Sequence, residues 1–202
     1  MLKDIPNFKC FVQSDEFSSW NLDQRVEFAK DNFKGTIHIN TESTEQIHRA
    51  YLESELGRFP ERPMIEMTIP SLVDASLAPE GHFVSSMFMQ YYPRGARVSK
   101  EEIWANILRN MDMYAPGFSD LVLHYEILRP EDLEDEIALT GGHIFHGSMS
   151  LHSMFIARPF PDLAGYGSPI KNLWRCGAGT HPGGGVMGAP GRNCAQVAFV
   201  GK

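Results

Sequence analysis

The chain has 202 residues, 43% of them hydrophobic, which suffices for one sizeable core or for one core with a small satellite. Its 25 acidic residues outnumber 18 basic ones, for a formal net charge of -7, so nucleic acid is not an expected partner. No apolar stretch approaches the length of a membrane span, and the N-terminus lacks a signal peptide's apolar run, so we expect a cytoplasmic location, or the mitochondrial matrix in a eukaryotic member.

Four short runs, rich in β-branched, aromatic and Met residues and bounded by Gly or Pro, predict strands. They are residues 35–40, 62–70, 82–92 and 121–128. In the third run, strict alternation separates two faces, both apolar enough to be covered. One face holds Phe83, Ser85, Met87, Met89 and Tyr91, and the other holds Val84, Ser86, Phe88, Gln90 and Tyr92.

Three segments between and after these runs predict helices. Residues 43–56 carry apolar residues at helical spacing, with Thr41, Ser43 or Thr44 available as the N-cap. A second helix begins at Ser99, where Glu102 completes a capping box, and ends at 115–117. A third begins within 129–137, where a proline suits the first turn. The chain is therefore predicted to be α+β, with a mostly antiparallel sheet and helices on one face.

The end of the chain has a different character. Seven glycines lie between 177 and 191, after a predicted strand at 171–176 and before a predicted helix at 189–199. Glycine backbone lets successive N–H groups converge on an anion, and the helix that follows adds its dipole. No Lys-Ser/Thr pair follows the glycines, and no acidic residue follows about twenty positions on, so neither common phosphate fingerprint is present. A plain glycine-rich turn before a packed helix would have the same composition.

The segment "LWRCGAGTHPGGGVMGAPGRNCA" (173–195) resembles the terminal cofactor motif of the phytoene-dehydrogenase-like FAD oxidoreductases, which include carotenoid desaturases and isomerases. The similarity extends through "IHIN", "IEMTIPSLVDASLAPEG", "YAPGF" and "LTGGHIFHGSMSLHSMFIARP". It implies a substrate-binding-type domain over 1–165 and the C-terminal strand, loop and helix of an FAD-binding domain over 166–202. It also implies that FAD contacts Gly177, Gly179, Gly183, Gly184, Gly185, Val186 and Gly188.

No strand followed by GxGxxG stands anywhere in 1–160, although this family holds the ADP half of FAD with such an N-terminal unit. The resemblance therefore implies a fragment of an FAD-dependent oxidoreductase, inactive and without FAD when alone, that needs a nucleotide-binding half as its partner. The complete enzyme would transfer hydride from an apolar small molecule to the flavin. The alternative is a stand-alone binding or interaction module that has lost catalysis. Apolar surface exposed by the missing half would favour homo-oligomers.

The histidines and cysteines give weaker signals. His146 is a candidate for orienting substrate or relaying a proton, since no general base is obvious. His143 and His146, with His152 nearby, lack a Cys or carboxylate partner at ligand spacing, so no metal is expected. His181 is expected to brace the glycine segment. Three cysteines without a CxxC pair indicate a reducing compartment and small core residues; they are Cys10, Cys176 and Cys194.

Overall fold

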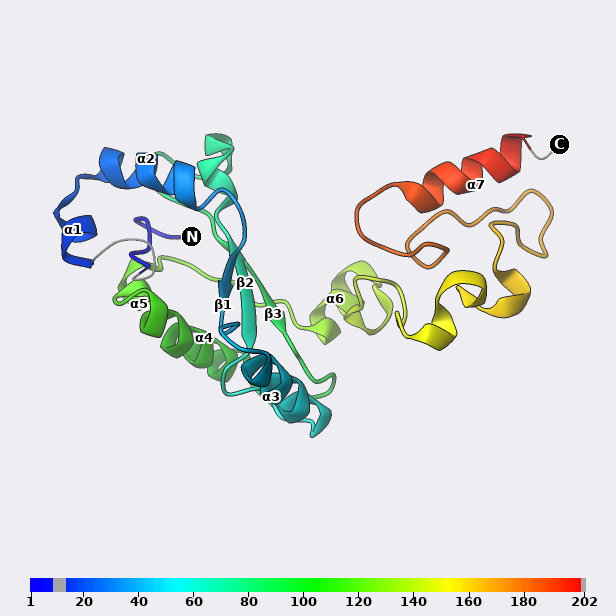
Figure 1. Cartoon of the computed structure of the whole chain (residues 1–202), viewed down its shortest axis with the longest axis horizontal. Helices are drawn as coiled ribbons and strands as arrows, with labels where there is room; N and C mark the ends of the chain where they lie inside the picture. The colour runs from blue at the N-terminus through cyan, green and yellow to red at the C-terminus, as the bar shows by residue number, and fades with distance from the viewer. Residues whose placement is uncertain (9–13, 201–202) are drawn as a thin grey trace. The chain divides into compact units, whose positions relative to one another are not determined.

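The computed structural model describes residues 1–8 and 14–200, so Cys10 lies outside the described residues. The chain forms two compact units, Met1–Ile127 and Leu128–Lys202, drawn in Figure 1. The first contains α1 (Ser14–Ser19), α2 (Leu22–Asn32), β1 (Ile37–Ile39), α3 (Thr44–Glu55), β2 (Met64–Thr68), β3 (Ser86–Gln90), α4 (Lys100–Tyr114) and α5 (Phe118–Leu121). The second contains α6 (Pro130–Ile137) and α7 (Ala189–Val200), with short 3-10 turns between them. The predicted α+β class is confirmed.

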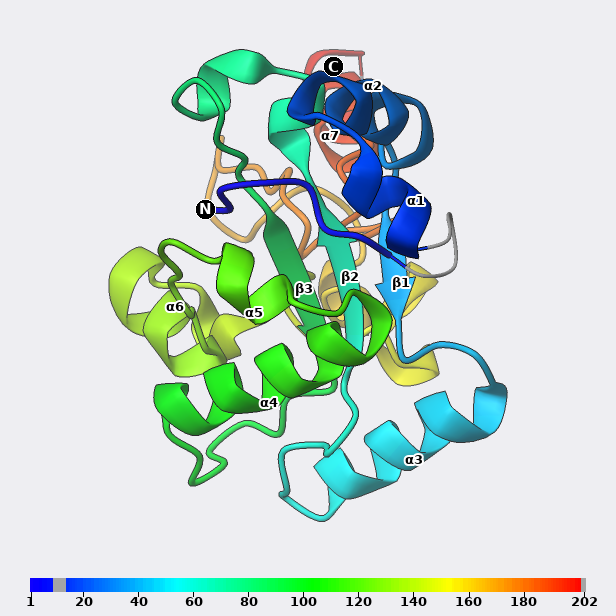
Figure 2. The same ribbon diagram turned by 90° about the vertical axis from the view of Figure 1, so that its left-hand side faces the viewer.

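The sheet is antiparallel, as predicted, and its strands lie in the order β1-β2-β3. In β2, Ile65 and Met67 are fully buried, whereas the alternate residues are only partly buried. The register places Ile65 between Ile39 and Met89, so one face of the sheet is apolar. Figure 2 shows α4 lying across the sheet, and its residues Ile103, Ile107 and Met111 join the same core. Burial of this apolar stripe against the sheet is the main stabilising term of the first unit.

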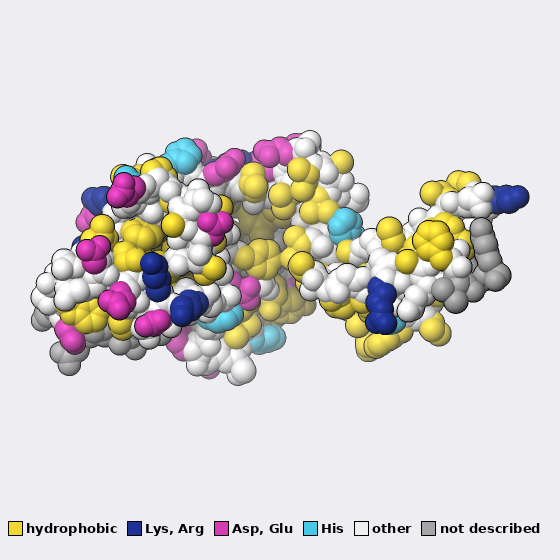
Figure 3. All heavy atoms as spheres, turned by 90° about the horizontal axis from the view of Figure 1, so that it is seen from above, with side chains coloured by type: hydrophobic (Ala, Val, Ile, Leu, Met, Phe, Trp, Pro, Cys, Tyr) yellow, Lys and Arg dark blue, Asp and Glu magenta, His cyan; other side chains and the backbone are white. Residues whose placement is uncertain are grey.

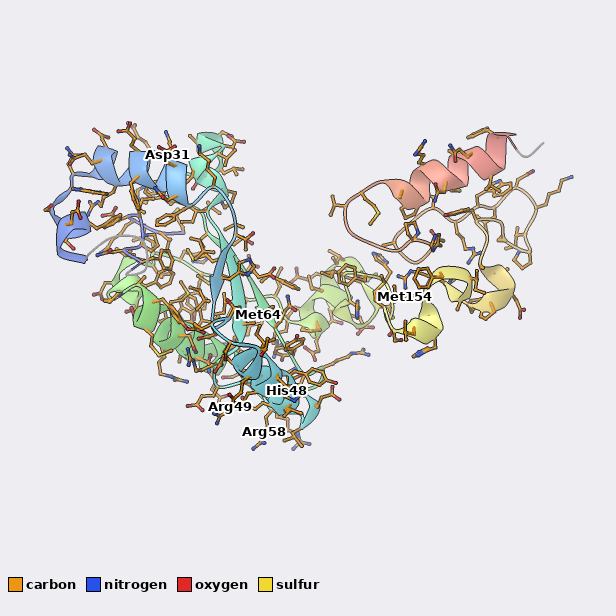
Figure 4. The ribbon with its side chains drawn as sticks, viewed as in Figure 1. Asp31, His48, Arg49, Arg58, Met64 and Met154 are labelled. Carbon is orange, nitrogen blue, oxygen red and sulfur yellow. The ribbon has the colours of Figure 1, made fainter. Side chains whose placement is uncertain are left out.

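The opposite face of the sheet is more exposed within this unit. His38, Glu66 and Phe88 are cross-strand neighbours on it, and Phe88 is 45% exposed. Met64, labelled in Figure 4, begins β2 on this face. The third strand was predicted to have two faces apolar enough to be covered; within this unit the face of Phe88 is the more exposed one.

Local capping signals set the helix starts. Ser43 caps α3, and Ser99 and Glu102 form the predicted capping box of α4. The Ser99 Oγ accepts from the Glu102 N–H at 3.1 Å, while a Glu102 carboxylate oxygen accepts from the Ser99 N–H at 2.8 Å. Hydrogen bonds to the carboxylate from the backbone N–H and from the side chain of Ser99 hold the pKa of Glu102 below its usual range. Asn21 and Gln24 form an equivalent box for α2, a helix that we did not predict.

We expect Ser99→Ala to lower the free energy of unfolding by about 1 kcal/mol, because the N-cap hydroxyl satisfies an otherwise unpaired backbone N–H. Urea denaturation followed by circular dichroism measures the change. Ser54→Ala, in the body of α3, is the matched control, since alanine is favourable within a helix. Equal effects of the two substitutions would show that the cap contributes nothing.

The strand predicted at 121–128 is wrong. Gly117, at φ 79°, allows a short helix to start at Phe118, and α5 takes up the first residue of the predicted strand. Beyond it, Val122 forms only an isolated bridge with Leu2, which also bridges Phe83. The N-terminal segment, distant in sequence, thus takes the backbone pairing that a neighbouring strand would have needed.

A buried polar network joins α4 to the segment before β2. Asn110 Nδ2 donates to the Asn106 backbone oxygen (2.9 Å), the Asn106 side-chain oxygen (3.0 Å) and the Glu61 carbonyl (3.1 Å). Its Oδ1 accepts from Asn40 Nδ2 at 2.9 Å, and Asn40 also donates to the Pro63 carbonyl. Buried amides with their bonds made fix the position of the chain that enters β2.

The second unit holds its loops with arginine and tyrosine side chains. Arg175 Nη2 donates to the carbonyls of Leu163 (2.6 Å), Gly165 (2.7 Å) and Gly167 (2.9 Å). The strand predicted at 171–176 is wrong, since Asn172 has φ 65° and Trp174 forms only an isolated bridge with Gly167. A left-handed residue interrupts the extended backbone that a ladder requires.

Over the described residues, every helix is too short or too polar to cross a bilayer.

Candidate functional site

The predicted glycine segment forms an irregular loop that leads into α7. Gly183, Gly185 and Gly188 have φ of 110°, 132° and 67°, values that favour glycine. Val186 also has a positive φ, and its side chain is fully exposed at the loop tip, next to an exposed Met187. The predicted loop and helix are therefore present, and the backbone of 185–188 faces outward from the unit.

The amides at this tip are available to a ligand. In the part of the chain that the structure describes, the backbone N–H groups of residues 185–188 donate to no protein acceptor. Arg192 N–H donates to the Gly188 carbonyl at 3.0 Å, which closes the first turn of α7. The first N–H groups of a helix have no partner inside it, and they carry the positive end of its dipole. The tip thus presents donors toward solvent.

A buried arginine holds the other side of the loop. Arg158 is only 2% exposed, and its guanidinium donates to the Ala178 carbonyl from Nε (3.2 Å) and from Nη2 (2.7 Å). The same group donates to the carbonyls of Phe145 (2.6 Å), Ser148 (3.0 Å) and Ser153 (3.4 Å). Among the described residues no carboxylate pairs with it, so its charge is balanced by carbonyl dipoles alone. Arg158 therefore ties the 145–153 segment to the glycine loop.

The glycines of the loop have different surroundings. A Cβ at Gly183 would lie 3.0 Å from Met149 Cε, and one at Gly184 would lie 2.9 Å from a Phe145 ring carbon. The Phe145 ring therefore disfavours any side chain at Gly184, while the positive φ of 110° favours glycine at Gly183 and the nearby Met149 leaves little room beside it. Gly177 is different, because it has no positive φ and nothing lies within 4 Å of the position of its Cβ. Neither packing nor backbone strain within this structure explains a glycine there.

Of the predicted histidines, His146 lies beside the loop. A Cβ at Gly179 would lie 3.9 Å from both the Cβ and the carbonyl oxygen of His146, whose side chain is exposed. His181 is partly buried, and its carbonyl accepts from the Tyr166 hydroxyl at 2.7 Å. His143 and His152 make only local contacts, with Phe145 N–H and Ser150. The described residues include no group of three His, Cys, Asp or Glu placed to hold a metal.

The two described cysteines flank the loop. Cys194 is buried in α7, as expected for a small core residue, but Cys176 is exposed, so the prediction is wrong for Cys176. Cys176 directly precedes Gly177, whose carbonyl accepts from the Thr180 N–H at 3.0 Å and so begins a turn. Burial, with further contributions from the charge of Cys176 and a hydrogen bond with it, raises the pKa of the Cys194 thiol.

A second polar site lies in the first unit. A cavity of about 250 Å³ is lined by Gln46, Arg49, Ala50, Glu53, Glu61 and Arg62, and Arg49 is labelled in Figure 4. Its two arginines are matched by two glutamates, and Arg49 pairs with Glu53 at 3.5 Å, so the cavity carries no net excess of either charge. At its edge, Tyr114 donates to Glu42; burial and this bond raise the pKa of Tyr114. Desolvation raises the pKa of Glu42, but the Tyr114 bond and the Arg62 charge outweigh it, and the net shift is downward.

The relatives of the chain include oxidoreductase-domain proteins. Over 171 residues, it is 46% identical to pyridine nucleotide-disulfide oxidoreductase domain-containing protein 2 of Rattus norvegicus and of Mus musculus, covering 81% of this chain and 29% of each relative. The chain is homologous to these proteins. It is also 29% identical over 136 residues to 4,4'-diapolycopen-4-al dehydrogenase of Metabacillus indicus, covering 65% of this chain and 26% of that protein. No protein-family model matches the chain.

The chain thus spans less than a third of the length of these curated relatives. The homology extends to an oxidoreductase-domain protein, in agreement with the resemblance inferred from the motif. Sequence reasoning missed Arg158 and Tyr166, whose partners are backbone carbonyls and an amide from other segments. The only signal was their polarity within an otherwise apolar or glycine-rich stretch.

Proposed function

We propose that the chain is the part of an FAD-dependent oxidoreductase that contacts the flavin and borders the substrate. The outward-facing amides of residues 185–188, at the start of α7, carry this proposal. Gly177 supports it, because the free space beside its backbone suits the close approach of a planar ring. The homologous oxidoreductase-domain proteins provide the chemical class.

In this proposal the residues of the loop act by electrostatics. When bound, the flavin supplies a hydride acceptor. The N–H groups of 185–188 and the N-terminal end of α7 would stabilise negative charge on the reduced ring, because preorganised donors cost no reorganisation during the reaction. The buried Arg158 guanidinium adds a positive charge close to Gly183, since a Cβ at Gly183 would lie 3.5 Å from its Nε. The proposed flavin contacts are the seven predicted above, Gly177 to Gly188.

Within the first unit, we propose that the exposed face of the sheet offers apolar surface to the substrate. Phe88 and Met64 supply apolar surface there, which suits an apolar substrate. His146, exposed beside Gly179, is the proposed group for orienting substrate or relaying a proton. The same proposal divides the chain at 165/166 into a substrate-binding part and a flavin-binding part. It also includes a nucleotide-binding half as the partner of this chain.

The proposal is tested by transplanting the chain. The chain alone is expected to purify colourless, because the ADP half of FAD is proposed to bind to the nucleotide-binding half and not to this chain. A chimera in which this chain replaces the matched segment of the rat relative is expected to hold flavin, measured by absorbance after removal of free FAD. A folded chimera without flavin, beside a yellow rat parent, would favour the non-catalytic binding module instead.

Gly177→Val in that chimera is expected to lower flavin affinity at least about 10-fold, equivalent to about 1.4 kcal/mol. The branched side chain would occupy the space that the ring is proposed to approach, and no atom of the chain lies within 4 Å of the position of its Cβ. Gly35→Val is the matched control, because Gly35 also has nothing within 4 Å and no positive φ. Unchanged flavin retention in the Gly177 variant would remove this residue from the site.

A further inference from the structure

Helix α3 presents apolar side chains to the solvent. Leu52 is 47% exposed, and Leu56, at the C-cap, is 68% exposed. Because they are four positions apart, they lie on one side of the helix. Ala50 is the buried residue of α3, and helical geometry places it opposite Leu52. The two leucines therefore take no part in the core of the first unit.

Polar side chains without an intrachain ion pair lie on the same side of α3. Glu45, His48 and Glu55 are exposed. Together with Leu52 they have the 3-4-3 spacing of a helix face that packs on another helix. Arg58, labelled with His48 in Figure 4, follows the helix, and its N–H donates to a carbonyl of the last turn at 3.0 Å, which keeps it at the helix end. Over the described residues, none of the four polar side chains forms an ion pair within the chain.

The order of these groups along α3 is complementary to its own reverse. When two copies of α3 pack antiparallel with Leu52 opposite Leu52, residues equally far before and after it face each other. His48 then lies beside Glu55 of the partner subunit, whose carboxylate can accept from the imidazole. Glu45 lies beside Arg58 of the partner subunit, so opposite charges meet at both ends of the contact. Parallel packing would instead put each carboxylate beside its own copy, which is unfavourable.

We propose that Glu45, His48, Leu52, Glu55 and Leu56, the α3 face, bind the α3 face of a second copy of the chain. The two helices are antiparallel, and the twofold axis passes beside Leu52, so every contact occurs twice. One helix pair buries less than the about 800 Å² per partner of a standard interface, so dimers are expected at concentrations on the order of tens of micromolar. The inference requires neither a flavin nor a nucleotide-binding half, so it is independent of the proposed function.

The first test is sedimentation equilibrium of the 202-residue chain at concentrations up to about 200 µM. A reversible equilibrium between monomer and dimer is expected. Leu52→Glu should weaken it at least about 10-fold, because two carboxylates then meet at the centre of the apolar contact.

Val73→Glu is the matched control, because Val73 is an apolar residue of the same unit and is 76% exposed. It comes after β2, whereas α3 comes before β2, so the two lie at opposite ends of that strand. Figure 3 shows the surface at the end of the unit away from α3, where hydrophobic and charged side chains are interspersed. Val73→Glu should leave the dimerisation constant unchanged.

A charge exchange tests the direction of the packing. Glu45→Arg alone and Arg58→Glu alone should each weaken dimerisation about 5-fold, since like charges then meet twice. The double variant restores opposite charges, so its dimerisation constant should return to that of the wild type. Within one chain the two positions are separated by the length of α3, about 20 Å, so the recovery can only come from contacts between subunits.

Cross-linking locates the twofold axis. In a chain with Cys10→Ser and Cys176→Ser, the remaining native thiol is that of the buried Cys194. Leu52→Cys should then give a covalent dimer with a short bismaleimide, because the two copies of position 52 are adjacent. Glu45→Cys is the control and should stay monomeric, since antiparallel packing separates its two copies by about 20 Å.

Several outcomes would overturn the proposal. A chain that stays monomeric throughout the concentration range forms no such dimer, and equal weakening by Leu52→Glu and Val73→Glu would place the contact elsewhere. A double charge variant as weak as either single one would mean that the charges do not face each other, and cross-linking through Glu45→Cys would mean parallel packing. A monomeric chain that bound the remaining segment of the rat relative through Leu52 would assign the α3 face to that partner.

Discussion

Asn110→Ala is expected to lower the free energy of unfolding of the first unit by about 3 kcal/mol. The amide of Asn110 is buried and makes four hydrogen bonds, to Asn40, Glu61 and Asn106. Removing it leaves buried groups on these partners without one of their bonds, and each such group costs more than the net value of the bond lost. Urea denaturation monitored by tryptophan fluorescence provides the measurement.

Asn32→Ala is the matched control, because Asn32 also lies in a helix and its side chain donates to a carbonyl, that of Phe28 at 2.9 Å. Asn32 is exposed, so water replaces the lost bond and the expected change is within about 0.5 kcal/mol. Both substitutions introduce alanine into a helix, so helix propensity contributes alike. If Asn110→Ala cost no more than Asn32→Ala, the network would contribute nothing to stability.

Sequence reasoning succeeded where the signal is local. The capping box at Ser99 depends on two residues three positions apart, and the strand alternation predicted for β3, where Met87 and Met89 pack against the core and Phe88 is exposed, depends on neighbours two positions apart. It failed at 121–128, where an apolar run typical of a strand pairs briefly with Leu2 instead. The missed helix α2 had a readable signal, since Asn21 and Gln24 have capping-box spacing.

The same distinction applies to the candidate site. The glycines predicted the loop from the sequence, because a residue type alone indicates where a positive φ is permitted. Gly183, Gly185 and Gly188 do have a positive φ. The role of Arg158 was invisible, since the carbonyls that it contacts come from two separate segments, 145–153 and Ala178. Backbone acceptors leave no residue type to recognise, so this part of the site required coordinates.

Arg158→Met is expected to loosen the glycine loop while the first unit stays folded. Methionine fills much of the space, but it leaves the carbonyls of Phe145, Ser148, Ser153 and Ala178 without their donor. Several bonds from a charged donor are lost, and the local free energy of opening should fall by about 3 kcal/mol. Amide hydrogen exchange in residues 143–154 and 177–183 should become about 100-fold faster, as that free energy implies.

Two further variants separate the bonds of Arg158 from its charge. Arg158→Lys keeps the charge, but its single ammonium cannot reach carbonyls on both segments as the planar guanidinium does, so exchange should lie between wild type and Arg158→Met. Arg192→Met removes an exposed arginine from α7 and should leave exchange in both segments unchanged. If exchange in Arg158→Lys matched wild type, the charge alone would hold the loop. If exchange in Arg158→Met also matched wild type, the guanidinium would be dispensable. The loop would then be held by packing of Gly183 and Gly184 against Met149 and Phe145.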